Sequence, residues 1–270
     1  MPARRLLCAL VCGAALAGCG GDDGREPERT AAARPCGAFE PPAGTMGGGR
    51  ALECRVDGRR FLLYVPASAA GPAPLLLALH GVGGPAATPE ATLEASRLDA
   101  AAEEHGFVLA LPEGEDGTWD DGPGSPDVAF AGAVIDAAGE EHAIDPDRVY
   151  ATGWSGGGFM AHRLACDAAD RIAAIAVLHA PLRGPCAPAR PPDVLQLAGE
   201  ADDVLPAAGG TTPDGTSLPP LRKAMRRWQA LGGRVKLVEV PDGAHAWWTE
   251  EADGFEANAR IWAFLAPARR

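Results

Sequence analysis

A serine in a glycine-rich setting is the strongest chemical signal in the chain. Residues 153–157 read Gly-Trp-Ser-Gly-Gly, which has the form G-x-S-x-G, and an apolar run at residues 149–152 precedes them. Small residues around a serine permit a sharp turn between a strand and a helix, which lifts the hydroxyl out of the sheet. An alcohol is a weak nucleophile at neutral pH and needs a base held by an acid. The pattern therefore predicts nucleophilic catalysis by Ser155 and requires two partners.

Two later segments could supply these partners. Residues 199–203 (Gly-Glu-Ala-Asp-Asp) and residues 241–245 (Pro-Asp-Gly-Ala-His) each follow an apolar run. The order serine, acid, histidine, with each residue after a strand, is typical of one class of catalytic triad. His162 falls within an expected helix and His179 ends an expected strand, so we expect packing or rim roles for both. His245 is then the expected base, oriented by an acid of the earlier segment.

A third glycine-rich segment could stabilise a developing oxyanion. Residues 80–84 (His-Gly-Val-Gly-Gly) follow the apolar run at residues 75–79. We expect the backbone N–H groups of Val82 and Gly156 to form an oxyanion hole. The segment lacks the Gly-Lys-Ser/Thr and G-x-G-x-x-G patterns of phosphate-binding loops.

Short apolar runs alternate with helix-like stretches, which predicts an α/β fold with a mostly parallel central sheet flanked by helices in a single domain. The expected strands are 61–65, 75–79, 108–111, 149–152, 174–178, 194–197 and 235–240. The expected helices are 89–105, 127–142, 156–166, 220–231 and 254–265. Ligands of such sheets bind outside the carboxyl ends of the strands, where the catalytic candidates fall.

Tryptophans on the expected site loops are candidates for the pocket wall. Trp119, Trp154 and Trp247 do not follow the spacing of a helical core. We expect them to bind substrate together with His80, which opens the glycine-rich segment. Packing in the core stays open as the alternative, because tryptophan is usually well buried.

Composition excludes several classes of protein. The chain has 270 residues, a length that fits one domain, and 24 Lys plus Arg against 36 Asp plus Glu give a net charge of −12. Such a charge repels a phosphate backbone, so we expect no nucleic-acid partner. There is no Cys-x-x-Cys or paired-histidine spacing, so no metal is predicted. Hydrolysis by a serine requires no cofactor.

The N-terminus has the pattern of an export signal. Arg4 and Arg5 precede the apolar stretch Leu6 to Leu16, which is too short to span a bilayer. We expect residues 1–18 to be a signal peptide that is removed from the mature protein.

The signal ends in Leu-Ala-Gly-Cys at residues 16–19, which resembles a bacterial lipobox. We expect Cys19 to carry lipid and to hold the protein on a membrane in the cell envelope; an ordinary cleaved signal is the alternative. Residues 19–35 are polar and glycine-rich, which predicts a flexible tether. The catalytic domain is then expected at residues 36–270.

Four cysteines remain in the expected domain, namely Cys36, Cys54, Cys166 and Cys186. Export to an oxidising compartment predicts two disulfides among them. Three pairings are possible. We favour Cys36 with Cys54 and Cys166 with Cys186, because each pair closes a short loop.

The motifs together resemble a known group. The resemblance extends from about Cys36 to Leu265 and is carried by Val-Asp-Gly-Arg at 56–59, His-Gly at 80–81, Leu-Pro-Glu-Gly at 111–114, Asp-Pro-Asp-Arg-Val-Tyr at 145–150, Gly-Trp-Ser at 153–155, Gly-Glu-Ala-Asp-Asp-Val-Leu-Pro at 199–206 and Asp-Gly-Ala-His-Ala-Trp at 242–247. The sequence is similar to secreted α/β-hydrolases grouped as polyhydroxybutyrate depolymerases, feruloyl esterases and acetyl xylan esterases, including lipoprotein esterases. The resemblance implies that Ser155 is the nucleophile, His245 the base and Asp202 the acid, with Asp203 as the alternative acid.

The resemblance also implies the reaction, which is hydrolysis of feruloyl, acetyl or hydroxyalkanoate esters through an acyl-enzyme. Val82, Ala244 and Trp248 stand where the group often has Cys, Gly and Pro, which leaves the ester undetermined. A peptidase of the prolyl oligopeptidase type is a rival within enzymes. A non-catalytic surface protein that binds polysaccharide or polyester is the rival from another class.

Overall fold

The structure is a computed structural model that describes residues 36–270 apart from 43, 46, 213–214 and 250–253. These residues belong to one compact unit. The expected signal peptide, the expected lipid-bearing Cys19 and the expected tether lie outside the described residues. Among the helices that are described, none has the length and hydropathy required to cross a bilayer.

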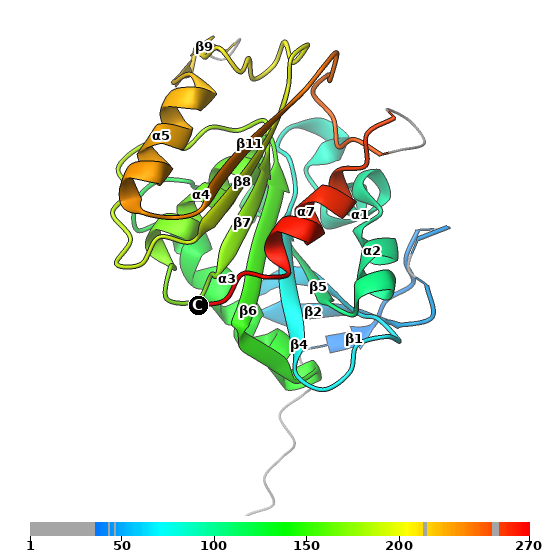
Figure 1. Cartoon of the computed structure of the whole chain (residues 1–270). Coiled ribbons are helices and arrows are strands. Elements are labelled where there is room, and N and C mark those ends of the chain that lie inside the picture. The colour runs from blue at the N-terminus through cyan, green and yellow to red at the C-terminus, as the bar shows by residue number, and fades with distance from the viewer. Residues whose placement is uncertain (1–35, 43, 46, 213–214, 250–253) are drawn as a thin grey trace, which may run out of the picture. The chain divides into compact units, whose positions relative to one another are not determined.

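Nine strands of the described residues form one sheet in the order β1-β2-β3-β5-β4-β6-β7-β8-β11. The strands are β1 Cys36–Ala38, β2 Arg50–Val56, β3 Arg59–Val65, β4 Ala73–Leu79, β5 Val108–Pro112, β6 Ile144–Trp154, β7 Ala174–Leu178, β8 Asp193–Gly199 and β11 Val235–Val240. The first three neighbouring pairs in this order are antiparallel and the other five are parallel (Figure 1). The predicted mostly parallel sheet is therefore confirmed. A separate two-stranded ribbon consists of β9 Gly210–Thr211 and β10 Ser217–Leu218.

Helices cover both faces of the sheet (Figure 1). They are α1 Pro89–Ser96, α2 Leu98–His105, α3 Pro126–Glu141, α4 Gly156–Asp167, α5 Leu221–Leu231 and α7 Ala257–Leu265. Strand β4 is buried throughout, and its side chains alternate between the two faces. Leu75, Leu77 and Leu79 pack in one core with α3, α4 and α5, whereas Leu76 and Ala78 pack in the other with α1, α2 and α7. Both faces of a central strand must be apolar in such a three-layer arrangement.

The structure corrects the expectation of one helix over residues 89–105. Arg97 adopts a left-handed conformation with φ of 52° and separates α1 from α2. Tertiary contacts stabilise this break, because the carbonyl of Ser96 accepts a hydrogen bond of 2.6 Å from the side chain of Asn258 at the start of α7. Strands β1 and β2 were not among the expected strands, because their exposed and partly exposed positions at the edge of the sheet interrupt the apolar pattern.

Both favoured disulfides are present in the structure. Cys36 and Cys54 lie opposite each other on β1 and β2, and their bond fixes the edge of the sheet. Cys166 near the end of α4 is bonded to Cys186 in the segment after β7. The second bond closes the loop that contains Arg183.

Candidate active site

Ser155 occupies the turn between β6 and α4. Its φ of 54° and ψ of −123° lie outside the regions that most residues with a side chain adopt. A strained conformation of this kind costs on the order of 1–3 kcal/mol and is most often found at functional sites. The turn starts α4 immediately after the serine, so the first N–H groups of the helix lie beside the Ser155 side chain.

The glycines of the pattern are required by close approach of backbone. A methyl group built on Gly153 would lie 2.4 Å from the carbonyl oxygen of Gly157, and one on Gly157 would lie 2.1 Å from the carbonyl oxygen of Leu79. No side chain fits at either distance. The sequence pattern therefore reflects how tightly the turn packs against the end of β4.

The loops after β8 and β11 are joined to each other by backbone hydrogen bonds. Ala201 N–H donates to the carbonyl of Gly243 at 3.1 Å. Within the first loop, Oδ1 of Asp202 accepts from the N–H groups of Val204 at 2.9 Å and Leu205 at 2.8 Å. These bonds fix the Asp202 carboxylate and leave its other oxygen directed elsewhere.

That second oxygen faces two histidines. Nδ1 of His245 lies 2.9 Å from Oδ2 of Asp202 in a hydrogen bond, and the carboxylate is almost completely buried. Burial raises the pKa of Asp202, but the interactions with His179 and His245 and the Leu205 N–H outweigh it, and the pKa lies well below its usual range. Asp203, the alternative acid, is exposed. The geometry therefore joins His245 to Asp202.

The sequence analysis assigned His179 a packing or rim position, and the structure places it in this cluster. Its Nδ1 lies 2.6 Å from Oδ2 of Asp202, and its Nε2 makes a hydrogen bond of 2.8 Å with the carbonyl of Ala246. The rings of His179 and His245 are 4.6 Å apart. Two histidines thus share one carboxylate oxygen.

The same three side chains meet the elementary requirements for holding a metal ion, because one ligand atom from each lies within 4.8 Å of the others. Two ligands of a tetrahedral zinc ion are separated by about 3.3 Å, given metal–ligand bonds of about 2.0 Å. The two histidine nitrogens lie 2.6 and 2.9 Å from Oδ2. These distances fit direct contacts between the side chains better than joint coordination of an ion.

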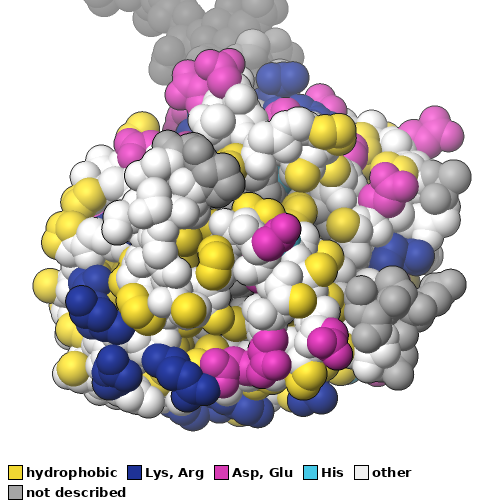
Figure 2. Space-filling view, turned by 90° about the horizontal axis from the view of Figure 1, so that it is seen from above, with side chains coloured by type: hydrophobic (Ala, Val, Ile, Leu, Met, Phe, Trp, Pro, Cys, Tyr) yellow, Lys and Arg dark blue, Asp and Glu magenta, His cyan; other side chains and the backbone are white. Residues whose placement is uncertain are grey.

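Ser155 lies in the wall of a cavity of about 360 Å³. The lining residues come from the glycine-rich segment, the loop before α3, the start of α4, and the segments after β7 and β8: Val82, Trp119, Asp121, Ser155, Gly156, Phe159, Arg183, Val204, Leu205, Thr212, Thr216 and Leu218. In the view from above, hydrophobic side chains lie around an acidic side chain near the middle of the molecule, and the Lys and Arg side chains lie toward the edges (Figure 2). Val82, Gly156 and Trp119 are therefore brought together with Ser155 as expected.

Sequence reasoning missed a charged pair in the cavity wall. Arg183 donates two hydrogen bonds to the carboxylate of Asp121, at 3.0 and 2.6 Å, and its guanidinium lies 3.8 Å from the ring centre of Phe159. Short motifs could not reveal this pair because 62 positions separate its members.

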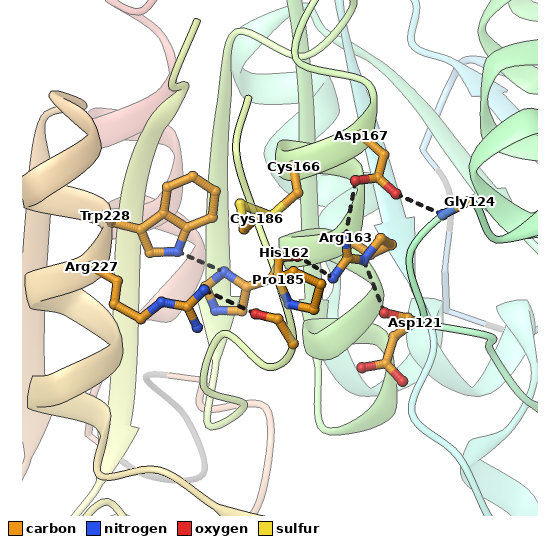
Figure 3. The surroundings of a disulfide bond; sticks show 11 residues. Asp121, Gly124, His162, Arg163, Cys166, Asp167, Pro185, Cys186, Arg227 and Trp228 are labelled. Carbon is orange, nitrogen blue, oxygen red and sulfur yellow. Dashed lines mark hydrogen bonds and ion pairs between the residues drawn. A yellow bond between two sulfur atoms is a disulfide. The ribbon is translucent and has the colours of Figure 1, made fainter. Parts of the chain in front are cut away.

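Contacts around the second disulfide fix the two chain segments that carry Asp121 and Arg183. Arg163 of α4 donates to the carbonyl oxygens of Asp121 and Pro185, at 2.9 and 3.1 Å (Figure 3). Pro185 precedes Cys186, which is bonded to α4 through Cys166. The buried arginine and the disulfide therefore fix the two segments that supply Asp121 and Arg183 to the cavity.

The structure does not place His80 in the cavity. The side chain is completely buried, its Nδ1 donates to the carbonyl of Gly81 at 2.7 Å, and its Nε2 accepts from the N–H of Gly114 at 2.8 Å. Burial lowers the pKa of His80, in agreement with a neutral ring that accepts a hydrogen bond. The expected substrate contact is therefore corrected, since His80 joins two loops behind the site.

Two of the three expected pocket tryptophans are also absent from the cavity wall. Trp247 is buried and donates to the side-chain oxygen of Asn258 at 3.0 Å. Trp154 is half-buried and its ring lies 5.5 Å from that of His245. Trp154 ends β6 and packs against the second core, which contains Trp247, and neither side chain lines the cavity. Trp119 alone of the three lines the cavity.

Comparison with known proteins agrees with this geometry. Residues 126–183, which contain α3, β6, Ser155, α4 and β7, match the prolyl oligopeptidase family. The chain is 39% identical over 178 residues to NocK of Nocardia uniformis subsp. tsuyamanensis, whose name describes it as an esterase; the match covers 60% of this chain and 51% of that protein. It is 32% identical over 167 residues to feruloyl esterase B of Piromyces equi, covering 56% and 31%. The chain thus spans about half or less of the length of these relatives.

Among solved structures, a fluorophosphonate-binding serine hydrolase of Staphylococcus aureus superposes with a TM-score of 0.59 at 14% identity, covering 82% of this chain and 99% of that one. At this identity the likeness shows the fold alone. The described residues have the α/β-hydrolase fold, as expected from the sequence. The NocK protein and feruloyl esterase B both carry the names of esterases.

Proposed function

We propose that this protein is a serine hydrolase of carboxylic esters. The observation that carries the proposal is the joint arrangement of a strained Ser155 in the cavity wall and an Asp202–His245 hydrogen bond on the adjoining loops. Asp202 engages Nδ1 of His245, which leaves Nε2 to accept the proton of the serine. The names of the sequence relatives support the same activity.

The reaction follows from these roles. Ser155 Oγ attacks the ester carbonyl while His245 takes its proton, and the N–H groups of Val82 and Gly156 donate to the oxyanion. Each such donor typically contributes about 3 kcal/mol in the transition state. His245 then protonates the departing alcohol. Water, deprotonated by His245, attacks the acyl-serine and releases the acid.

The cavity favours an aromatic acyl group among the feruloyl, acetyl and hydroxyalkanoate classes. Trp119 and Phe159 present rings to a space of about 360 Å³, and Arg183 and Asp121 offer polar partners. An acetyl group would leave most of this space unfilled. The feruloyl esterase among the relatives supports this choice.

Initial rates of the full-length protein on matched acetyl, butyryl, 3-hydroxybutyryl and feruloyl esters test the proposal. Ser155→Ala should lower kcat by at least about 10⁴-fold on every ester, whereas Ser68→Ala, an exposed serine before β4, should retain activity. Turnover that survives Ser155→Ala, or no turnover of any ester by the wild type, would overturn the proposal. A matched feruloyl amide and a peptide anilide test the peptidase that the family match makes the second candidate.

We also propose that the protein acts outside the cytoplasm and is held there by lipid on Cys19. The two disulfides support export, because such bonds persist in oxidising compartments. Expression in a bacterial host with an alkyne-labelled fatty acid tests the anchor. Cys19→Ser should abolish labelling and move the protein to the soluble fraction, while Cys8→Ser should do neither. Unchanged labelling of Cys19→Ser would contradict the anchor.

A further inference from the structure

Trp154 stands directly before Ser155, and its indole contacts two other parts of the site. A methyl group built on Gly81 would lie 3.0, 3.1 and 3.2 Å from Cε2, Cζ2 and Nε1 of this indole, and these are its three nearest contacts. The centres of the Trp154 and His245 rings are 5.5 Å apart, a separation at which aromatic rings pack together. One side chain thus adjoins both the glycine-rich segment and the catalytic histidine.

The residues on either side of Ser155 contact consecutive residues of the glycine-rich segment. Trp154 lies against Gly81, and Gly156 lies against the side chain of Val82. We refer to residues 81–82 as the oxyanion segment, because Val82 carries one of the proposed oxyanion donors. Two successive contacts set the position of this segment and its direction relative to the serine.

Neither a hydrogen bond nor substrate binding accounts for the tryptophan. Its Nε1 is buried and has no hydrogen-bond partner among the described residues, which is unfavourable for a polar group. The side chain is also not part of the cavity wall. What the indole supplies is therefore its shape, through the contacts of the ring with Gly81 and His245.

We propose, on the basis of the proposed esterase function, that Trp154 is a positioning residue that holds the oxyanion segment and the base in place around Ser155. Catalysis requires the oxyanion donors about 3 Å from the developing charge and the base within hydrogen-bond reach of the serine. These interactions strengthen in the transition state. A residue that positions them therefore changes kcat by a similar factor for every ester and leaves KM little changed.

Trp154→Phe in the full-length protein tests this role. The smaller ring lacks the indole atoms nearest to Gly81, so kcat should fall by about 10–10²-fold on acetyl, butyryl and feruloyl esters alike. Trp262→Phe is the matched control, because Trp262 of α7 is also half-buried and packs against the same core, and it should leave kcat unchanged. A change in KM alone would assign Trp154 to substrate binding, and unchanged kinetics would show that it only packs. Either result would overturn the inference.

Gly81→Ala tests the same contact from the other side. Gly81 does not have a positive φ, so its backbone accepts alanine, and the methyl group presses on the indole. This variant should also lower kcat. Combined with Trp154→Phe, or with Trp154→Tyr if the first variant does not fold, it should recover part of the loss, since the methyl group enters space that the indole has left. Losses that simply multiply in the double variant would overturn the inference.

A fluorophosphonate probe separates this inference from the proposed function. Ser155 Oγ bonds to the phosphorus as fluoride leaves, the serine proton passes to His245, and the phosphoryl oxygen occupies the oxyanion hole, so labelling needs the same positioning as ester cleavage. A wild type that is labelled but cleaves no ester would refute the esterase. Labelling of Trp154→Phe at a rate about 10–10²-fold lower would then still support the inference, and an equal rate would overturn it. A wild type that is neither labelled nor active would overturn both.

Discussion

Val82 packs against Gly156 with no room for a side chain between them. A methyl group built on Gly156 would lie 2.4 Å from Cγ1 and 2.8 Å from Cγ2 of Val82. The two residues that carry the proposed oxyanion donors thus set each other's position. Their contact offers a way to disturb the oxyanion hole without touching the triad.

Gly156→Ala should displace the segment of Val82 and lower kcat by about 10²–10³-fold, the typical cost of losing one donor. Because the clash is with a side chain, Val82→Ala combined with Gly156→Ala should recover part of the loss. Gly139→Ala in α3, where a methyl group meets open space, is the control and should retain full activity. A double variant no better than Gly156→Ala would contradict the proposed geometry.

The local parts of the site could be predicted from the sequence because short-range sterics determine them. The pattern around Ser155 encodes a turn whose glycines have no space for side chains, and a single segment is enough to reveal it. The segments of the candidate acid and base could be located because each follows an apolar strand, whereas the choice of Asp202 over Asp203 came from the family resemblance. The outline of the sheet followed from the same apolar runs, with errors at the polar edge strands and at Arg97.

The pairs that depend on distant loops could not be predicted. His179 meets Asp202 only because the loops after β7, β8 and β11 converge, and its sequence position resembles that of any residue at the end of a strand. Arg183 follows β7 and Asp121 precedes α3, so their side chains meet only in the folded protein. His80 and Trp247 were placed in the pocket because they lie on the expected loops, but loop membership does not determine the direction in which a side chain points.

Arg183 should contribute to the binding of aromatic acyl groups. Arg183→Gln removes a cation from beside Phe159 and leaves Asp121 without its paired charge. A hydrogen bond from Arg183 to the acyl group would contribute about 1 kcal/mol to binding, so KM for feruloyl esters should rise about fivefold with kcat little changed. Arg222→Gln, an exposed arginine paired with Glu239, should have no effect. Equal changes in KM for acetyl and feruloyl esters would argue against a role in acyl recognition.

His162 should make folding sensitive to mild acid. Burial lowers the pKa of His162 to about 4. Its Nδ1 accepts from the indole N–H of Trp228 at 3.2 Å, which requires a neutral ring (Figure 3). An unfolded histidine takes up a proton near pH 6.5, so this contribution to stability is present above that pH and is lost as the pH falls toward 4. Its full size is about 3 kcal/mol.

Chemical denaturation at several pH values checks this expectation. His162→Gln should lower stability at pH 8 but flatten its decline between pH 7 and pH 4. Trp228→Phe removes the hydrogen-bond donor and keeps the titrating ring, so it should lower stability while retaining most of the decline. His80, whose pKa burial also lowers, contributes in the same direction, so the slope should shrink rather than vanish. An unchanged slope in His162→Gln would refute the assignment.

Asp202 can be distinguished from its neighbour Asp203 by two measurements. Asp202→Asn should reduce kcat by about 10⁴-fold, because the amide cannot hold His245 in the tautomer that accepts the serine proton. The exposed Asp203→Asn should leave kcat unchanged.

The dependence of stability on pH should also distinguish Asp202 from Asp203. The pKa of Asp202 is lower in the folded protein than in the unfolded chain, so its contribution is present above about pH 4 and is lost in stronger acid, where the unfolded chain takes up the proton first. The acid-induced fall in the free energy of unfolding should therefore be shallower in Asp202→Asn than in the wild type. If Asp203→Asn instead abolished turnover, the acid of the triad would have to be reassigned, and the shared oxygen of the two histidines would be a structural feature alone.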